Sequence, residues 1–129
     1  MIVVDSSALI AIALDESAAD QCQKAIESEE ELAISAVTLA EALIVAERRG
    51  VRSRVTRLVA ASGMEIVDVT AARAQLVADA YRRWGKGLHP AELNFGDCFA
   101  YALAAERGCP LLYVGNDFAR TDIRSALPA

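Results

Sequence analysis

The chain has 129 residues, a formal net charge of −5 at pH 7 and a mean hydropathy of +0.28, with 54% hydrophobic residues. This length fits a single domain with a substantial core, which we expect to span residues 1–129. The acidic total argues against a general nucleic-acid binder with a basic face, and no apolar run approaches the roughly 18–20 residues that span a bilayer.

Short apolar runs alternate with longer segments of helical period. Serines open the first helical segment, a threonine opens a later one, and Gly50, Gly63 and Gly108 follow helical segments as C-terminal stops. In chain order, the prediction is a strand at 2–4, helices at 6–14 and 17–28, a strand at 32–35, helices at 37–49 and 51–61, a strand at 65–69, a helix at 70–85, a loop at 86–93, a helix at 95–108, a strand at 111–115 and short turns after it.

The alternation of strands and helices indicates an α/β fold. The predicted strands are short and read as wholly apolar, which is typical of a parallel sheet covered by helices on both faces. Ligands of such sheets bind beyond the carboxyl ends of the strands, where the strand order reverses. The residues that follow each strand are therefore the first candidates for a functional site.

The cysteines and the amino-terminal residues both point to the cytoplasm. Cys22, Cys98 and Cys109 are odd in number and form no CxxC motif, so we expect buried thiols rather than disulfides or a zinc site. The opening MIVVD lacks the basic segment and the cleavage site of a signal peptide. We therefore expect a cytoplasmic protein with no membrane partner.

Basic residues gather in two segments despite the acidic total. Residues 47–57 carry five arginines, and residues 81–87 carry two arginines and a lysine. A local basic patch can contact phosphates. The same residues can equally serve as solvated outer faces of helices, and the sequence leaves both readings open.

Two acids directly follow predicted strands. Asp5 comes after the first strand, where it can cap the next helix in competition with Ser6 and Ser7. Asp117 comes after the last strand, where Asn116 and Asp117 could simply form a turn. If both strands are parallel, the two acids lie at the same edge of the sheet.

Glu41 is harder to explain as a structural residue. It lies in VTLAEALIVAE, a helix that is apolar nearly all round and is therefore expected to be buried. An unpaired buried carboxylate costs several kcal/mol or stays protonated, so this residue needs a cation. A distant arginine could supply it, and a bound metal ion is the reading we favour.

Asp97 lies in the first turn of the apolar helix that begins in LNFGDCFAYALA. With Asn94 as the N-cap, Asp97 occupies the third helical position, where a carboxylate completes a capping box and interacts well with the helix dipole. That role explains helix stability alone. The dipole also favours the ionised carboxylate, which a metal ion requires.

Together, the four acids indicate a metal site. Carboxylates that converge on one crevice repel one another unless a counter-charge is present. The chain has only one histidine, so a ligand set made of oxygens favours Mg²⁺ or Mn²⁺ over zinc. Mg²⁺ held by carboxylates and water is the usual arrangement for phosphoryl chemistry.

These motifs give the chain a family likeness. It resembles the PIN-domain ribonucleases and, within them, the VapC toxins of bacterial type II toxin–antitoxin systems, from end to end. The likeness is carried by MIVVDSSAL at 1–9, SAVTLAEA at 35–42, LNFGDCFAYALA at 93–104 and LLYVGNDFARTDI at 111–123.

The resemblance implies a three-layer α/β/α sandwich with a mainly parallel sheet, Mg²⁺-dependent endoribonuclease activity, a homodimer and a small cognate antitoxin. The family's acidic quartet falls on Asp5, Glu41, Asp97 and Asp117, as metal-holding and catalytic residues. Ser7 matches a family hydroxyl residue, and Asn116 stands beside the last acid. His89, in the KGLHPAEL loop, is either close to the substrate or an ordinary hydrogen-bonded surface residue.

Two other kinds of protein remain to be weighed. One is the same fold without catalysis, binding RNA or a protein, and the intact acidic quartet argues against it. The other is a phosphatase-like domain with a nucleophilic aspartate, but Ser6 and Ser7 follow Asp5 and no lysine occurs after Lys86. A dinucleotide-binding fold is disfavoured because no GxGxxG follows a strand.

Overall fold

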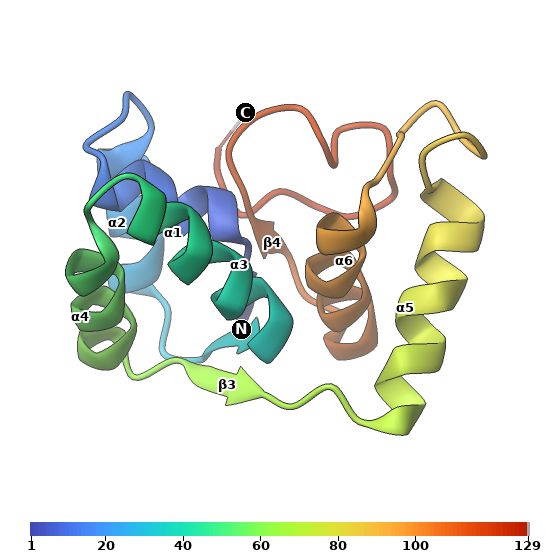
Figure 1. Ribbon diagram of the computed structural model, residues 1–129, viewed down its shortest axis with the longest axis horizontal. Helices are drawn as coiled ribbons and strands as arrows, with labels where there is room; N and C mark the ends of the chain where they lie inside the picture. Colours follow the sequence, from blue (N-terminus) through green and yellow to red (C-terminus); the bar gives the residue numbers. More distant parts are fainter. Residues whose placement is uncertain (129) are drawn as a thin grey trace.

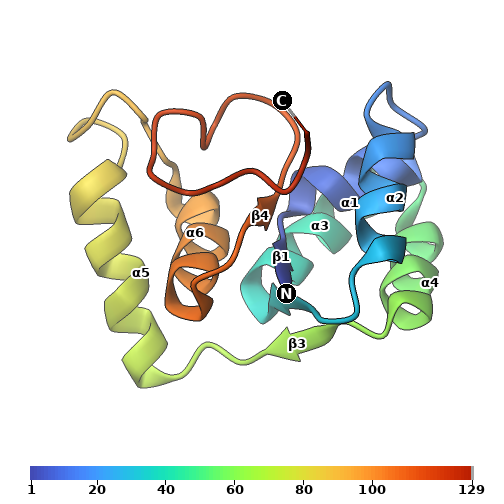
Figure 2. The ribbon, with the colours of Figure 1, turned by 180° about the vertical axis from the view of Figure 1, so that it is seen from behind.

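The computed structural model describes residues 1–128 and arranges helices around a small sheet (Figures 1 and 2). The strands are β1 (Ile2–Val4), β2 (Leu32–Ser35), β3 (Glu65–Val67) and β4 (Leu111–Leu112). The helices are α1 (Ser6–Ala13), α2 (Ala19–Ser28), α3 (Ala36–Arg48), α4 (Arg52–Ser62), α5 (Ala71–Trp84) and α6 (Phe95–Arg107). Within residues 1–128, no helix is both long and apolar enough to cross a bilayer.

The sheet is parallel throughout and has the strand order β3-β2-β1-β4. The chain moves outward from β1 to β2 and β3, and then returns to the other side of β1 to add β4. The strand order therefore reverses between β1 and β4. In α/β sheets, a crevice forms at such a reversal, outside the carboxyl ends of the two strands.

Helices cover both faces of the sheet, as the α/β/α prediction requires. Alternate strand residues point to opposite faces: Val4 and Ile34 belong to a core shared with α1, α2, α3 and α4, whereas Val3 and Ala33 belong to a core shared with α5 and α6. Figure 1 shows the two groups of helices on opposite sides of the strands. Burial on both sides explains why β1 and β2 are continuous apolar runs.

Several predicted boundaries are confirmed, and their local causes are visible. Thr70 caps α5 by accepting a hydrogen bond from the Arg73 backbone N–H. Gly63 and Gly108 end α4 and α6 in the left-handed conformation that glycine adopts without steric cost. Cys22, Cys98 and Cys109 are free and buried, as predicted.

Other predictions of local structure were wrong. β4 comprises two residues rather than five, and β3 carries an exposed Glu65 because it lies at the edge of the sheet. Helix α3 is not buried all round: the exposed fractions of Ile44 and Val45 are 58% and 38%. Its buried residues are Thr38, Ala42 and Ala46, a single stripe that packs inward.

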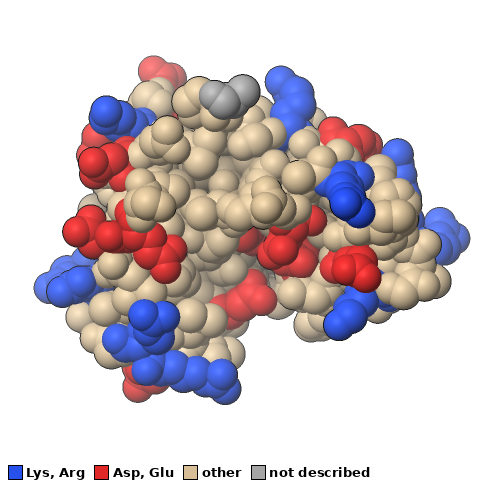
Figure 3. Space-filling view, turned by 90° about the horizontal axis from the view of Figure 1, so that it is seen from above, with Lys and Arg blue, Asp and Glu red and all other residues tan. Residues whose placement is uncertain are grey.

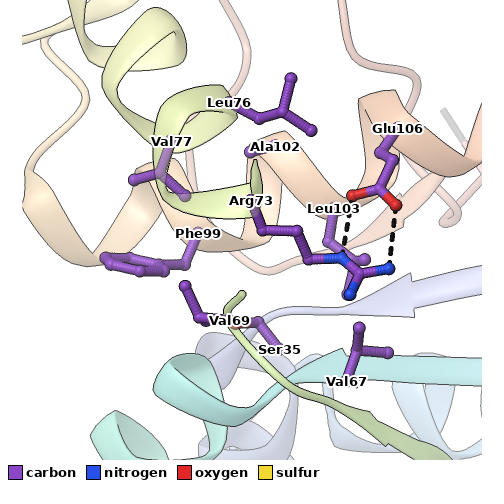
Figure 4. Close-up of a pocket in the computed structure, with 10 residues that line it drawn as sticks. All are labelled: Ser35, Val67, Val69, Arg73, Leu76, Val77, Phe99, Ala102, Leu103 and Glu106. Carbon is purple, nitrogen blue, oxygen red and sulfur yellow. Dashed lines mark hydrogen bonds and ion pairs between the residues drawn. The ribbon is translucent and has the colours of Figure 1, made fainter. Parts of the chain in front are cut away.

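An ion pair joins the two helices on the second face (Figure 4). The Arg73 guanidinium of α5 donates through Nε and Nη2 to the Glu106 carboxylate of α6, at 3.1 and 3.0 Å. Its Nη1 also donates to the Asp68 carbonyl, which precedes α5. Arg73 and Glu106 help to line a narrow space of about 10 Å³ beside Val67 and Phe99.

We expect this pair to contribute modestly to stability. Because both side chains are partly exposed, a double-mutant cycle with Arg73→Met and Glu106→Gln should give a coupling energy of about 0.5–1 kcal/mol. Urea denaturation of the four proteins would measure it. The same cycle on the more exposed Arg82 and Asp79 should give less, and equal coupling in the two cycles would contradict this interpretation.

Candidate functional site

Asp5 and Ser7 lie at the reversal of strand order, where they join the ends of β1 and β4. Asp5 is the N-cap of α1, and its Oδ2 accepts hydrogen bonds from the Ser7 backbone N–H at 3.1 Å and from Ser7 Oγ at 2.6 Å. Ser7 Oγ in turn accepts the Val114 N–H at 3.0 Å, just beyond β4. The Asp5 N–H donates to the Leu112 carbonyl at 2.9 Å. These bonds give the Asp5 carboxylate a defined orientation.

The second oxygen of Asp5 has no protein partner. Oδ1 is buried, and within residues 1–128 nothing donates a hydrogen bond to it. Burial raises the pKa of Asp5, with a further contribution from the Glu41 carboxylate, against the lowering effect of the Ser7 hydrogen bonds. A buried oxygen of this kind carries a desolvation cost until a donor or a cation reaches it.

Glu41 reaches the same region from α3. Ser6 Oγ donates to its Oε1 at 2.8 Å, which ties α3 to the first turn of α1. Its carboxylate also lies against Gly96, in the first turn of α6. Glu41 is half-buried rather than fully buried, so no arginine is needed to neutralise it: a hydroxyl and the positive end of α6 lie beside it instead.

Asp97 occupies the third position of α6 and forms the predicted capping box. Its Oδ2 accepts the Asn94 N–H at 3.1 Å, and Asn94 Oδ1 accepts the Asp97 N–H at 2.8 Å. Burial, with smaller contributions from the charges of Asp117, Asp5 and Glu41, raises its pKa to about 6 against the lowering effect of the Asn94 hydrogen bond. The charges of the other three acids therefore all act on the Asp97 carboxyl.

Asp117 and Asn116 lie in the exposed turn that follows β4, in which the Ala119 N–H donates to the Asn116 carbonyl at 3.1 Å. Asp117 is thus the outermost of the four acids. Viewed over this end of the molecule, acidic side chains gather in a notch near the middle, whereas Lys and Arg side chains lie mostly towards the rim (Figure 3). Both sequence positions fall where predicted, beyond the last strand.

The four acids share no basic partner. No ion pair found within residues 1–128 includes Asp5, Glu41, Asp97 or Asp117. The potential metal ligands are all oxygens, and they include Asp5 Oδ1, which has no hydrogen-bond donor within residues 1–128. Such ligands suit a hard divalent cation. As the side chains stand, however, no three His, Cys, Asp or Glu residues of this described part are close enough together to form a complete ligand set. The fit to a cation therefore rests on the chemistry of these oxygen donors.

Two other features of the sequence have structural explanations. His89 is half-buried, accepts the Ala91 N–H through Nδ1 at 2.9 Å and packs edge-on against Trp84, 4.8 Å between ring centroids. Arg54 donates to the Ala13 carbonyl at 3.0 Å and so holds α4 against the end of α1. Arg83 stacks over the Trp84 ring at 4.5 Å. These contacts favour structural roles for the three residues.

Sequence reasoning missed two residues of the site, Ser6 and Gly96. Ser6 was considered only as a competing helix cap, but its hydroxyl holds Glu41. Gly96 was not considered at all, although a β-carbon there would overlap Glu41 Oε2. A glycine inside the first turn of a buried helix, next to an acid, was the available signal, because glycine in helices often marks a close approach.

Comparison with known proteins shows the family of the chain. The PIN domain family model matches residues 2–124. The chain is 41% identical to ribonuclease VapC42 of Mycobacterium tuberculosis over 128 residues, which are 96% of this chain and 98% of that protein.

Solved structures share the fold at low sequence identity. The sarcin-ricin loop cleaving toxin VapC20 of M. tuberculosis superposes with a TM-score of 0.78 at 19% identity, covering 99% of this chain and 100% of that one. A toxin–antitoxin complex from Klebsiella pneumoniae contains a chain with a TM-score of 0.73 at 18% identity, with complete coverage of both. With the family match and the close relatives, these likenesses establish that the chain is a PIN-domain protein of the VapC ribonuclease family.

Proposed function

We propose that this protein is a Mg²⁺-dependent endoribonuclease that hydrolyses RNA phosphodiester bonds and acts as the toxin of a toxin–antitoxin pair in the cytoplasm. One observation carries the proposal: Asp5, Glu41 and Asp97 approach one another from distant parts of the chain, because Glu41 contacts both Ser6 and Gly96, and no ion pair within residues 1–128 neutralises these acids or Asp117. A divalent cation would supply the missing positive charge and would in turn attract the anionic phosphodiester.

In this reaction, the residues of the chain would have the following roles. Asp5, Asp97 and Asp117 would hold Mg²⁺ or Mn²⁺, with Ser7 fixing Asp5 and Asn94 fixing Asp97. Glu41, held by Ser6, would bind a second ion or orient the attacking water. Asn116 would help to position the substrate. When bound, the metal lowers the pKa of water and stabilises charge on the scissile phosphate. No protein nucleophile is required.

The relatives support the biological role. VapC42 is named a ribonuclease, VapC20 is described as a toxin that cleaves the sarcin-ricin loop, and the Klebsiella structure is a toxin–antitoxin complex. By analogy, we propose a small antitoxin protein as the cognate partner and a homodimer as the assembly. The exposed apolar residues Ile44 and Val45 of α3 give such partners a surface to cover.

Cleavage of RNA in the presence and absence of metal tests the proposal. Purified protein is incubated with total bacterial RNA in Mg²⁺, in Mn²⁺ and with EDTA, and new 5′ ends are mapped. We expect discrete cuts with either metal and none with EDTA. Cleavage that persists in EDTA would contradict the metal mechanism. RNA binding without cleavage in any metal would instead favour a PIN-fold binding module.

Metal affinity should depend on pH through Asp97. A carboxylate must be deprotonated to bind a metal ion, and the pKa of Asp97 is raised to about 6 in the metal-free protein. Affinity for Mn²⁺ should therefore be constant above pH 7 and fall by up to about tenfold per pH unit below 6. Electron paramagnetic resonance of free Mn²⁺ measures it directly.

The matched control for this titration is Asp79→Asn, which removes an exposed acid of α5. It should leave the pH profile of Mn²⁺ affinity unchanged, because Asp79 does not contribute to the raised pKa of Asp97. A flat profile between pH 7.5 and 5 in the unmodified protein would show that Asp97 does not bind the ion.

A further inference from the structure

Phe95 is the most exposed of the large apolar side chains in residues 1–128, with 71% of its surface open to water. It is the first residue of α6, two positions before Asp97. Its ring packs edge-on against Phe99, with 4.9 Å between centroids, and Phe99 is itself only 8% exposed. The Phe95 ring is therefore supported along one edge, while most of its surface remains free.

An apolar groove of about 450 Å³ begins at this ring. Helices α3, α5 and α6 form its walls, and the side chains that line it carry no charge. Its members include Val37 of α3, Val77 and Tyr81 of α5, and Phe95, Cys98 and Phe99 of α6. The Tyr81 hydroxyl is already engaged, because it donates to the Lys86 carbonyl.

Two walls of the groove, α3 and α6, also carry acids of the candidate site. On α3, Val37 lines the groove and Glu41 follows one helical turn later, so the two side chains share a face. On α6, Phe95 and Cys98 line the groove, whereas Gly96 and Asp97 between them face the acids. If an RNA strand binds with one phosphate at the acids, its adjoining nucleotide would lie over this groove.

We propose that Phe95 is a stacking platform for a nucleobase of single-stranded RNA next to the scissile phosphate. The inference rests on the proposed function and adds a base subsite to it. An exposed aromatic ring beside a phosphate-directed site is the usual means of holding unpaired bases. Because the groove offers few free polar groups, the contact depends on the face of the base and not on its hydrogen-bonding edge, so this subsite tolerates any base.

Binding of two labelled RNA dodecamers tests the platform without knowledge of the natural substrate. One is oligoadenylate, and the other has the same ribose-phosphate backbone without bases, so their charges are equal. Both are titrated by fluorescence anisotropy in Mg²⁺, with Asp97→Asn as the parent so that the RNA stays intact. The comparison proteins add Phe95→Ala or Phe95→Leu to this parent.

We expect the parent to prefer oligoadenylate over the abasic strand. Phe95→Ala should reduce that preference by about tenfold, the size of one base–aromatic stacking contact, and leave abasic binding unchanged. Phe95→Leu, which keeps an apolar side chain without an aromatic face, should lose most of the preference too. Equal weakening of both strands by Phe95→Ala, or no change in either, would overturn the proposal.

Two further readouts separate this inference from its rivals. Light scattering measures the mass of each protein, and a change of mass in Phe95→Ala would assign the ring to contact with a second copy and overturn the base platform. If the unmodified protein cleaves RNA but the parent shows no preference for oligoadenylate over the abasic strand, the platform alone is refuted. A preference that depends on Phe95 in a protein that never cleaves RNA would support the platform and refute the proposed nuclease.

Discussion

Asp97→Asn should abolish RNA cleavage while the protein stays folded. The amide keeps the shape of the side chain and can still accept the Asn94 N–H, so the start of α6 is preserved. It removes the negative charge that the cation requires, at the centre of the four acids. We expect cleavage to fall by at least about a hundredfold, as for other groups that position or stabilise charge in active sites.

The same substitution should stabilise the metal-free protein at neutral pH. The pKa of Asp97 is raised from 3.8 to about 6 in the folded state, so the fold favours the protonated form. That contribution is complete below pH 4 and is lost as the pH rises through 6, which leaves the ionised carboxylate unfavourable at pH 7. Asparagine carries no such charge, and the gain in the free energy of unfolding should be about 1–2 kcal/mol.

Thermal denaturation with EDTA at pH 7.5 and at pH 5 measures this effect. The stability advantage of Asp97→Asn over the unmodified protein should shrink at pH 5, because the unmodified carboxyl is then mostly protonated. Asp79→Asn should show neither the loss of cleavage nor the gain in stability. Full activity in Asp97→Asn, or a lower melting temperature without loss of metal binding, would contradict the assignment of Asp97 to the metal site.

Capping and metal binding were weighed as competing roles for Asp5 and Asp97, yet the geometry accommodates both. Each carboxylate has two oxygens, and the helix-capping hydrogen bonds use only Oδ2. In Asp5, the other oxygen is left buried and without a partner. The cap therefore orients the side chain, and the second oxygen remains available for a cation. Caps of this kind position a ligand at the edge of a sheet without additional residues.

The fold was largely predictable because its signals are local. Continuous apolar runs marked the strands that are buried on both faces. Thr70 marked the start of α5 through its side-chain cap, and Gly108 marked the end of α6 through its left-handed backbone. The prediction failed where burial depends on distant neighbours. The apolar residues Ile44 and Val45 suggested a buried α3, but no element of residues 1–128 covers their side of the helix. β4 pairs along only two residues before the chain turns away.

The candidate site was partly predictable, because some of its residues directly follow strands and the ends of strands can be read from the sequence. Asp5 and Asp117 were proposed because parallel strands end at one edge, and Glu41 because an acid is unusual in an apolar helix. The residues that hold these acids in position could not be predicted in the same way. Ser6 and Glu41 are 35 positions apart, and the hydrogen bond between them depends on how α1 packs against α3. Only the three-dimensional arrangement relates them.

Gly96→Ala should impair cleavage through Glu41. A β-carbon at this position would overlap Glu41 Oε2 and lie 3.0 Å from its Cδ, so the carboxylate must move away from the start of α6. The atoms displaced belong to the end of a flexible side chain, and alanine is a better helix former than glycine. The fold should therefore be retained, with an unfolding free energy within about 1 kcal/mol of the original. Cleavage should fall by about tenfold or more, because the carboxylate no longer faces the reacting groups.

A double-mutant cycle distinguishes this mechanism from a general disturbance of the site. If Gly96 acts by leaving room for the Glu41 carboxylate, then Gly96→Ala should cost little further activity in a Glu41→Ala background, since the displaced group is already absent. Cleavage rates of the four proteins in saturating Mg²⁺ provide the measurement, and Mn²⁺ affinity shows whether the remaining acids still bind metal. An equal loss in both backgrounds would mean that Gly96 matters for the path of α6 itself. Undiminished activity in Gly96→Ala alone would mean that the position of the Glu41 carboxylate is unimportant for catalysis.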